Sequence, residues 1–82
     1  MSTTKVLTPL RVTAPAELLD DDSAALDFLA GEFLFARMNG ADALDIVAAT
    51  ELLPTLALAA GAFDAAEMPA NFRLVDEAQL VE

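Results

Sequence analysis

Residues 32–48, "EFLFARMNGADALDIVA", can form either two helices or one hairpin, and the choice determines the fold class. In the helical interpretation, Asn39 and Gly40 end a helix of about residues 24–38 in a left-handed cap. Asp42 then begins a second helix, because its side chain can accept hydrogen bonds from the free amides at a helix start. The next apolar residues recur at helical intervals: Leu44, Val47 and Ala48.

The competing interpretation is a β-hairpin, which would give an α+β fold. Residues 32–38 contain the alternating run "EFLFARM", and the Asn39-Gly40 pair that follows is the strongest short hairpin signal. In that case the run would pair with "ADALDIV". We favour helices, because the second segment is rich in alanine, the best helix former.

The segment before this region predicts a capped helix with no fully polar side. The cluster "DDDS" at residues 20–23 offers oxygen atoms to free helix amides, with Ser23 or Asp22 as the best cap. Charged residues are spread around the helix, and apolar residues lie on every side of it. A helix of this kind is usually buried. An 82-residue chain can hardly surround it alone, so we expect other chains to help.

The flanking segments predict extended arms and one further helix. Residues 5–14 alternate around Pro9 and indicate an edge strand or arm, and Pro15 suits a brief helical turn. Thr50 can cap a helix that runs to about Ala60 or Phe63.

The C-terminal tail offers a short strand that could pair with the N-terminal arm, through Phe72, Leu74 and Val75. The expected fold is therefore mainly α: two or three short helices with extended arms at both ends, joined at most in a two-stranded ribbon. We assign residues 1–82 to a single small domain, with an extended arm over 1–14, a helical core over 15–63, and an irregular connection and C-terminal arm over 64–82.

Composition favours association with other proteins. The chain has 14 acidic and 4 basic residues, a net charge of −10, a hydrophobic fraction of 56%, and neither cysteine nor histidine. A small domain without disulfides or a structural zinc site gains stability most readily by oligomerisation. Direct nucleic-acid binding is not expected, because the four basic residues are scattered singly. Residues 46–63 are apolar, but Pro54 and the lack of flanking basic residues argue against a membrane span.

The residue types do not favour catalysis, a metal site or a cofactor. Four carboxylates are available for acid–base chemistry, but no nucleophile with an adjacent base can be assembled without His, Cys or Tyr. The aspartates at residues 20–22 lack the glycine and glutamate spacing of a calcium loop. We therefore predict a non-enzymatic protein with no cofactor. The four carboxylates are Glu17, Asp27, Glu32 and Asp45.

The leading hypothesis is a small acidic structural or accessory subunit that docks its apolar helix faces and arms onto a larger assembly, such as a phage particle. Its partners would be proteins, in a homo-oligomer or larger complex, in the cytoplasm or a virion, since no secretory signal is recognisable. The alternative is an acidic inhibitor or antitoxin-like regulator that covers a basic, nucleic-acid-binding surface. The candidate interface residues are Leu26, Phe28, Leu29, Phe33, Phe35, Leu44, Val47, Leu56, Phe63 and Phe72.

Overall fold

Strands and helices alternate along the chain in the computed structural model, which describes residues 10–80. The order is β1 (Leu10–Thr13), α1 (Asp22–Met38), β2 (Ala43–Ala48), α2 (Leu53–Ala60) and β3 (Asn71–Asp76). Short 3-10 turns connect or follow these elements: η1 (Ala16–Asp20), η2 (Thr50–Leu52), η3 (Ala65–Glu67) and η4 (Glu77–Leu80).

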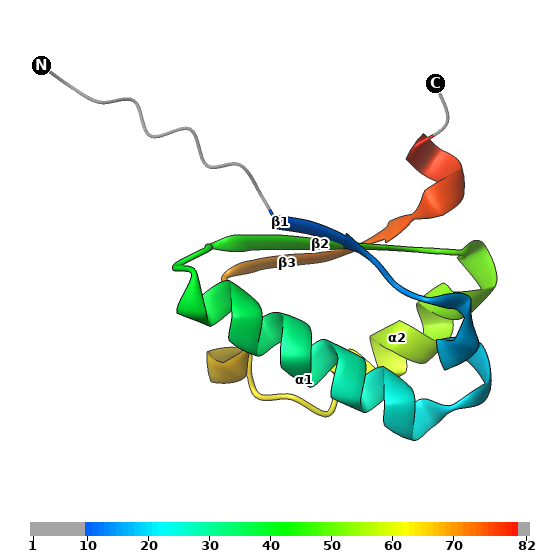
Figure 1. The fold of residues 1–82 in the computed structure, drawn as a ribbon, viewed down its shortest axis with the longest axis horizontal. Helices are drawn as coiled ribbons and strands as arrows, with labels where there is room; N and C mark the ends of the chain where they lie inside the picture. The colour runs from blue at the N-terminus through cyan, green and yellow to red at the C-terminus, as the bar shows by residue number, and fades with distance from the viewer. Residues whose placement is uncertain (1–9, 81–82) are drawn as a thin grey trace, which may run out of the picture.

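The three strands form a parallel sheet in the order β1-β2-β3. Each crossover moves one strand further in the same direction, and crossovers between parallel strands are almost always right-handed. Both crossover helices must then lie on the same face of the sheet. Figure 1 shows α1 and α2 together on one side, with the sheet above them.

The prediction of a mainly α fold is wrong: the chain has an α+β fold, as the alternative implied, but the hairpin of that alternative is wrong. Residues 43–48 are the central strand β2, and Asn39-Gly40 connects α1 to it without forming a hairpin. The sequence of a central parallel strand is typically a nearly continuous apolar run, because its side chains are buried on both faces of the sheet. The helical spacing of Leu44, Val47 and Ala48 is therefore a by-product of a segment in which almost every residue is apolar.

The predicted arms are also corrected, because each of them contributes a strand to the sheet, β1 from the N-terminal arm and β3 from the C-terminal one. β1 and β3 pair with β2 on its two sides and not with each other, so they form no two-stranded ribbon. β1 and β3 are thus linked only through β2, a segment that was predicted to be helical. Residues 5–9 of the proposed N-terminal arm lie outside the described residues.

The prediction of α1 and of its left-handed end is confirmed. Gly40 has φ +66°, and Gly40 and Ala41 donate their amides to the carbonyls of Arg37 and Ala36, as in a Schellman motif. At the other end the cap is one residue earlier than predicted: Asp21 Oδ1 accepts from Ala24 N at 3.0 Å.

The second predicted helix start is also displaced. Thr50 lies in η2 and does not cap α2, and its hydroxyl donates to Asp76 Oδ1 at 2.7 Å. α2 ends at Ala60, as expected, and Pro54 lies in its first turn, where a missing amide costs nothing.

The core lies between the helix layer and one face of the sheet. Leu29 and Phe33 of α1 pack with Leu44 and Ile46 of β2 and Leu56 of α2, all essentially buried. The Phe33 ring also meets two other rings edge to face, with centroid distances of 5.1 and 5.0 Å. These two rings belong to Phe63 and Phe72.

Candidate functional site

Within residues 10–80, one face of the sheet has no helix layer, and we call it the open face. Successive side chains of a strand point to opposite faces, so Leu10 and Val12 pack on the core while Arg11 and Thr13 point away from it. The strand register extends this alternation across the sheet. The open face consists of Arg11, Thr13, Ala43, Asp45, Val47, Asn71, Arg73 and Val75.

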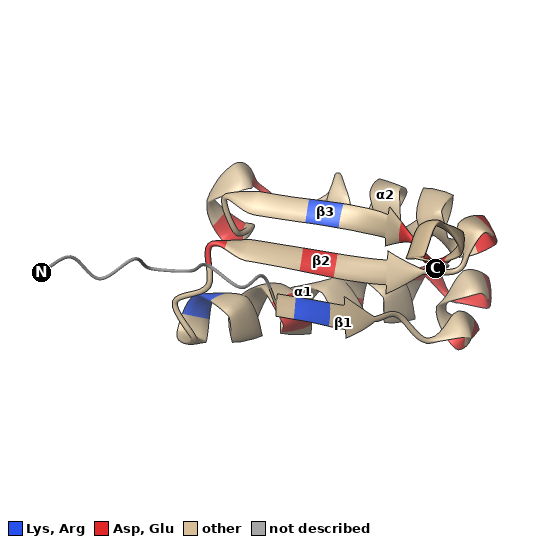
Figure 2. Cartoon of the chain, turned by 90° about the horizontal axis from the view of Figure 1, so that it is seen from above, with Lys and Arg blue, Asp and Glu red and all other residues tan. Residues whose placement is uncertain are grey.

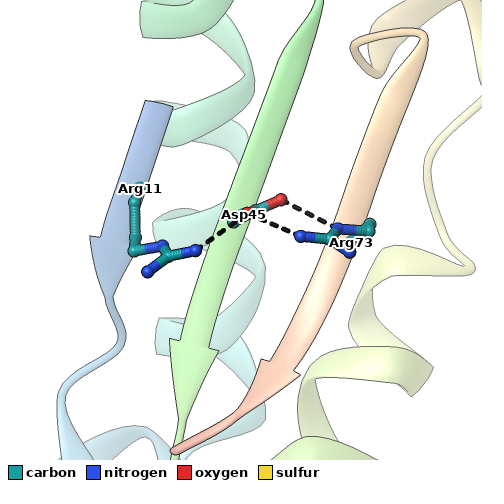
Figure 3. Close-up of polar contacts among 3 residues, drawn as sticks. All are labelled: Arg11, Asp45 and Arg73. Atoms are coloured by element: carbon teal, nitrogen blue, oxygen red, sulfur yellow. Dashed lines mark hydrogen bonds and ion pairs between the residues drawn. The ribbon is translucent and has the colours of Figure 1, made fainter. Parts of the chain in front are cut away.

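A row of three charged residues crosses the middle of the open face. Arg11 pairs in register with Asp45, and Asp45 with Arg73, so a carboxylate on the central strand lies between two guanidinium groups. Arg73 donates Nε to Oδ1 at 3.1 Å and Nη2 to Oδ2 at 2.9 Å, a bidentate pair. Arg11 Nη2 lies 3.5 Å from Oδ2 on the other side. Figure 3 shows the three side chains reaching one another across the strands.

Asp45 is buried by its neighbours, whereas the two arginines are largely exposed. Its side chain is 2% exposed, compared with 53% for Arg11 and 66% for Arg73. The hydrogen bonds from Arg73 lower the pKa of Asp45, and Arg11 lowers it further, although desolvation acts in the opposite direction. The carboxylate in turn raises the pKa of Arg73.

The open face is basic on balance, in a chain whose net charge is −10. Two arginines face one aspartate, which leaves one excess positive charge. Seen from above in Figure 2, the middle of the sheet carries the two basic positions with one acidic position between them. Because a guanidinium has five N–H donors, both arginines keep donors free for a further ligand.

A parallel sheet with one uncovered face is unusual. Parallel sheets occur almost only with both faces covered. Of the described elements, only η4 rises on the open side, near the carboxyl end of β3, where Asp76 Oδ1 accepts from Ala78 N at 2.9 Å (Figure 1). Arg11, Thr13 and Arg73 stay exposed. The arrangement is therefore suited to docking a second layer of protein.

The outer side of the helix layer carries a second unusual surface, which we call the helix-layer surface. An open hollow of about 180 Å³ lies between α1 and α2, with Leu26 and Leu58 in its lining. Leu58 is 81% exposed, Met38 76% and Leu34 55%. Leu34 and Met38 are four residues apart and so share one side of α1, while Leu26 and Leu58 line the hollow together. Exposed large apolar side chains of this kind are typical of protein contact sites. Asp27 is exposed and lies seven residues before Leu34, about two turns of α1, so it shares the outer side of the helix with Leu34. The helix-layer surface consists of Asp22, Leu26, Asp27, Leu34, Arg37, Met38, Leu58 and Glu67.

The predicted interface residues separate into three groups. Leu26 and Phe35 lie on the surface. Five are buried within the chain's own core or under the open face, so their apolar character needs no second chain: Leu29, Phe33, Leu44, Val47 and Leu56. Three are partly buried and pack against the core: Phe28, Phe63 and Phe72.

The charged row was missed by sequence reasoning, although the sequence contains a signal for it. Arg11, Asp45 and Arg73 each stand between two apolar residues, in "LRV", "LDI" and "FRL". One charge inside each of three apolar runs indicates strands with one buried face and a charge on the other. The sequence had shown these arginines only as scattered single residues.

The described residues offer little for metal or membrane chemistry. Within residues 10–80, no three carboxylates lie close enough together to hold a metal ion, and Asp21 of the acidic cluster caps α1. None of the helices in that range is both long and apolar enough to cross a bilayer. The free donors of the open face would suit a carboxylate, which is abundant on protein surfaces.

Comparison of the chain with protein-family models, with curated proteins and with solved structures finds no match.

Proposed function

We propose that this chain is a non-enzymatic assembly subunit whose open face docks onto another protein surface. The observation that carries the proposal is the position of both helices on one face of a parallel sheet (Figure 1). A partner that covers the other face completes the layering that parallel sheets normally have. The predicted role of terminal arms in docking is dropped, since both predicted arms contribute a strand to the sheet, β1 and β3.

The chemistry of the open face supports docking better than catalysis. A general base works best with a pKa near the operating pH, whereas the two arginines lower the pKa of Asp45. The carboxylate instead holds two guanidinium groups in place. Arginine is enriched in protein interfaces because its fork of donors and its apolar stem both contribute contacts.

The test is the apparent mass of the chain in a gentle extract of its native source at about 0.15 M salt, where the Debye length is about 8 Å. The wild-type chain should elute well above its own 8.6 kDa. Thr13→Glu places an acidic group on the open face at an exposed position and should shift elution to the monomer.

Ala16→Glu is the matched control, because it adds the same charge at an exposed position in η1, outside the open face. It should elute with the wild type. Elution of Thr13→Glu with the wild type would refute the proposal, and so would a wild-type chain that elutes as a monomer.

A further inference from the structure

We propose that the partner on the open face is the helix-layer surface of a second copy of this chain, so that copies stack head to tail. The inference rests on the proposed function and names the partner. Each copy would use two different surfaces, one to receive a neighbour and one to dock onto the next. Such a heterologous contact continues from copy to copy until the assembly closes into a ring or extends as a filament.

The layering of the fold supports this pairing. The open face lacks a helix layer, and the helix-layer surface is an existing pair of helices with exposed apolar side chains on its outer side. The outward position follows from helix geometry: Leu58 lies about 200° around α2 from Leu56, which is fully buried against the sheet. Stacking places α1 and α2 of one copy over the sheet of the next. This one contact covers the helix-layer surface of one copy and the open face of the next.

The charges of the two surfaces are complementary. The open face has one excess positive charge, from Arg11 and Arg73 against Asp45. On the helix-layer surface the acidic residues outnumber the one arginine by three to one: Asp22, Asp27 and Glu67 against Arg37. Docking one onto the other brings carboxylates toward the free donors of the guanidinium groups, where charge-assisted hydrogen bonds are strongest.

Pairing of like surfaces is disfavoured by the same charges. A two-fold axis that stacks two open faces with their charged rows in line places arginine over arginine and Asp45 over Asp45. Two helix-layer surfaces would bring their carboxylates together. The net charge of −10 also makes whole copies repel one another, but at about 0.15 M salt only charges within about 8 Å interact strongly. The local complementarity of the contact then dominates.

Complementation between two defective variants tests the head-to-tail contact. Thr13→Glu disables the open face and leaves the helix-layer surface intact, whereas Leu58→Glu does the reverse. Both positions are exposed, so both variants should keep the wild-type circular dichroism spectrum and, at concentrations low enough for the wild type to be monomeric, its melting curve. If Thr13→Glu fails to fold, Asn71→Glu at another exposed position of the open face replaces it. If Leu58→Glu fails to fold, Leu34→Glu at another exposed position of the helix-layer surface replaces it.

The measurement is the molar mass of each purified sample by light scattering at about 0.15 M salt, as a function of protein concentration. The purified wild-type chain should grow beyond a dimer. Each variant alone should stay at 8.6 kDa. An equimolar mixture of Thr13→Glu and Leu58→Glu has one intact surface of each kind, so it should give a dimer of twice that mass that does not grow further. Ala16→Glu should assemble like the wild type.

Three results would overturn the inference: a purified wild-type chain that stays monomeric, a wild-type chain that stops at a dimer, or a variant mixture that stays monomeric. The first result leaves the proposed function standing if the chain still elutes as a Thr13-dependent complex in the native extract. The partner is then a different protein. Failure in the extract as well would remove both proposals.

Discussion

Replacing Asp45 with asparagine should destabilise the fold through the charged row alone. The substitution keeps the volume of the side chain and its place on β2. It removes the charge that pairs with Arg11 and Arg73, and it replaces one of the two oxygens that accept from Arg73 with an amide nitrogen, which only donates. At one of the two contacts a donor then faces a donor, at a position that is 2% exposed. Water has little access to this position, so it cannot supply the hydrogen bonds that are lost.

The magnitude follows from the geometry of the bidentate pair. A hydrogen bond to a charged group contributes roughly 1.5–3 kcal/mol when it is protected from water. Two such bonds join Asp45 to Arg73, but the arginine side chain is 66% exposed, so screening and competing water reduce their contribution. We expect a loss of about 1.5 kcal/mol in the free energy of unfolding at pH 7, or roughly 6–12 °C in melting temperature for a domain of this size.

The effect should depend on pH with a defined sign. The pKa of Asp45 is lowered from its ordinary value of 3.8 in the folded state, so the folded chain holds this proton less tightly than the unfolded chain. The carboxylate therefore stabilises the fold above pH 3.8, and this contribution is lost as pH falls through the lowered pKa. The difference between wild type and Asp45→Asn should be largest near pH 7 and smaller at acid pH.

The assay is urea unfolding followed by circular dichroism at pH 7 and pH 2.5, values well away from the isoelectric point of about 4.1, where solubility is lowest. Asp42→Asn, at an exposed position just before β2, is the matched control and should change little. Equal stability of wild type and Asp45→Asn at pH 7 would refute the reasoning. An equal loss at both pH values would show that the charge of Asp45 is not responsible.

Three further predictions concern the core, the end of α1 and the interior of α1. Leu29→Ala should cost about 3 kcal/mol in urea unfolding, because Leu29 is fully buried, whereas Leu34→Ala on the exposed side of α1 should cost less than about 0.5 kcal/mol. Similar losses for the two would contradict the assigned helix face. Gly40→Ala should cost about 1 kcal/mol, because φ +66° strains an L-residue although no atom lies within 4 Å of the added methyl group. Gly31→Ala, within α1, should instead stabilise by up to about 1 kcal/mol, and a loss there would contradict the helical assignment.

α1 could be predicted from the sequence because its signals are local. The aspartates before it provide the cap, and Asn39-Gly40 provides the end. A cap acts over a few residues of the same segment, so a short stretch of sequence contains the whole interaction. The cap was nevertheless placed one residue too late, since Asp21, Asp22 and Ser23 are all suitable by residue type.

The sheet could not be predicted in the same way, because parallel pairing is non-local. β2 gains its partners from residues about 30 positions away on either side, and its own sequence suits a buried helix as well as a buried strand. Once β2 is read as a helix, residues 10–13 and 71–76 have no strand to join and appear as arms. The charged row depends on the same pairing, which is why its three members looked unrelated along the chain.

The surface of α1 shows why the interface prediction mixed core and surface residues. Its buried face holds Ala25, Leu29, Phe33 and Ala36, but Leu34 and Met38 on the outside are just as apolar. Apolar character alone does not distinguish a side chain packed on its own sheet from one that is left exposed. Whether a side chain of α1 is buried depends on which side of the helix faces the sheet, and this follows from the sheet topology.

The most direct test of the central claim, that protein covers the open face, is chemical labelling of single cysteines. The chain has no cysteine of its own, so Thr13→Cys and Ala16→Cys each introduce one exposed thiol. In the native extract at about 0.15 M salt, maleimide should label Thr13→Cys at least tenfold more slowly than in a dilute purified sample, while Ala16→Cys reacts equally fast in both. Equal rates for Thr13→Cys in the two samples would show that its side of the sheet stays in contact with water and would contradict the account.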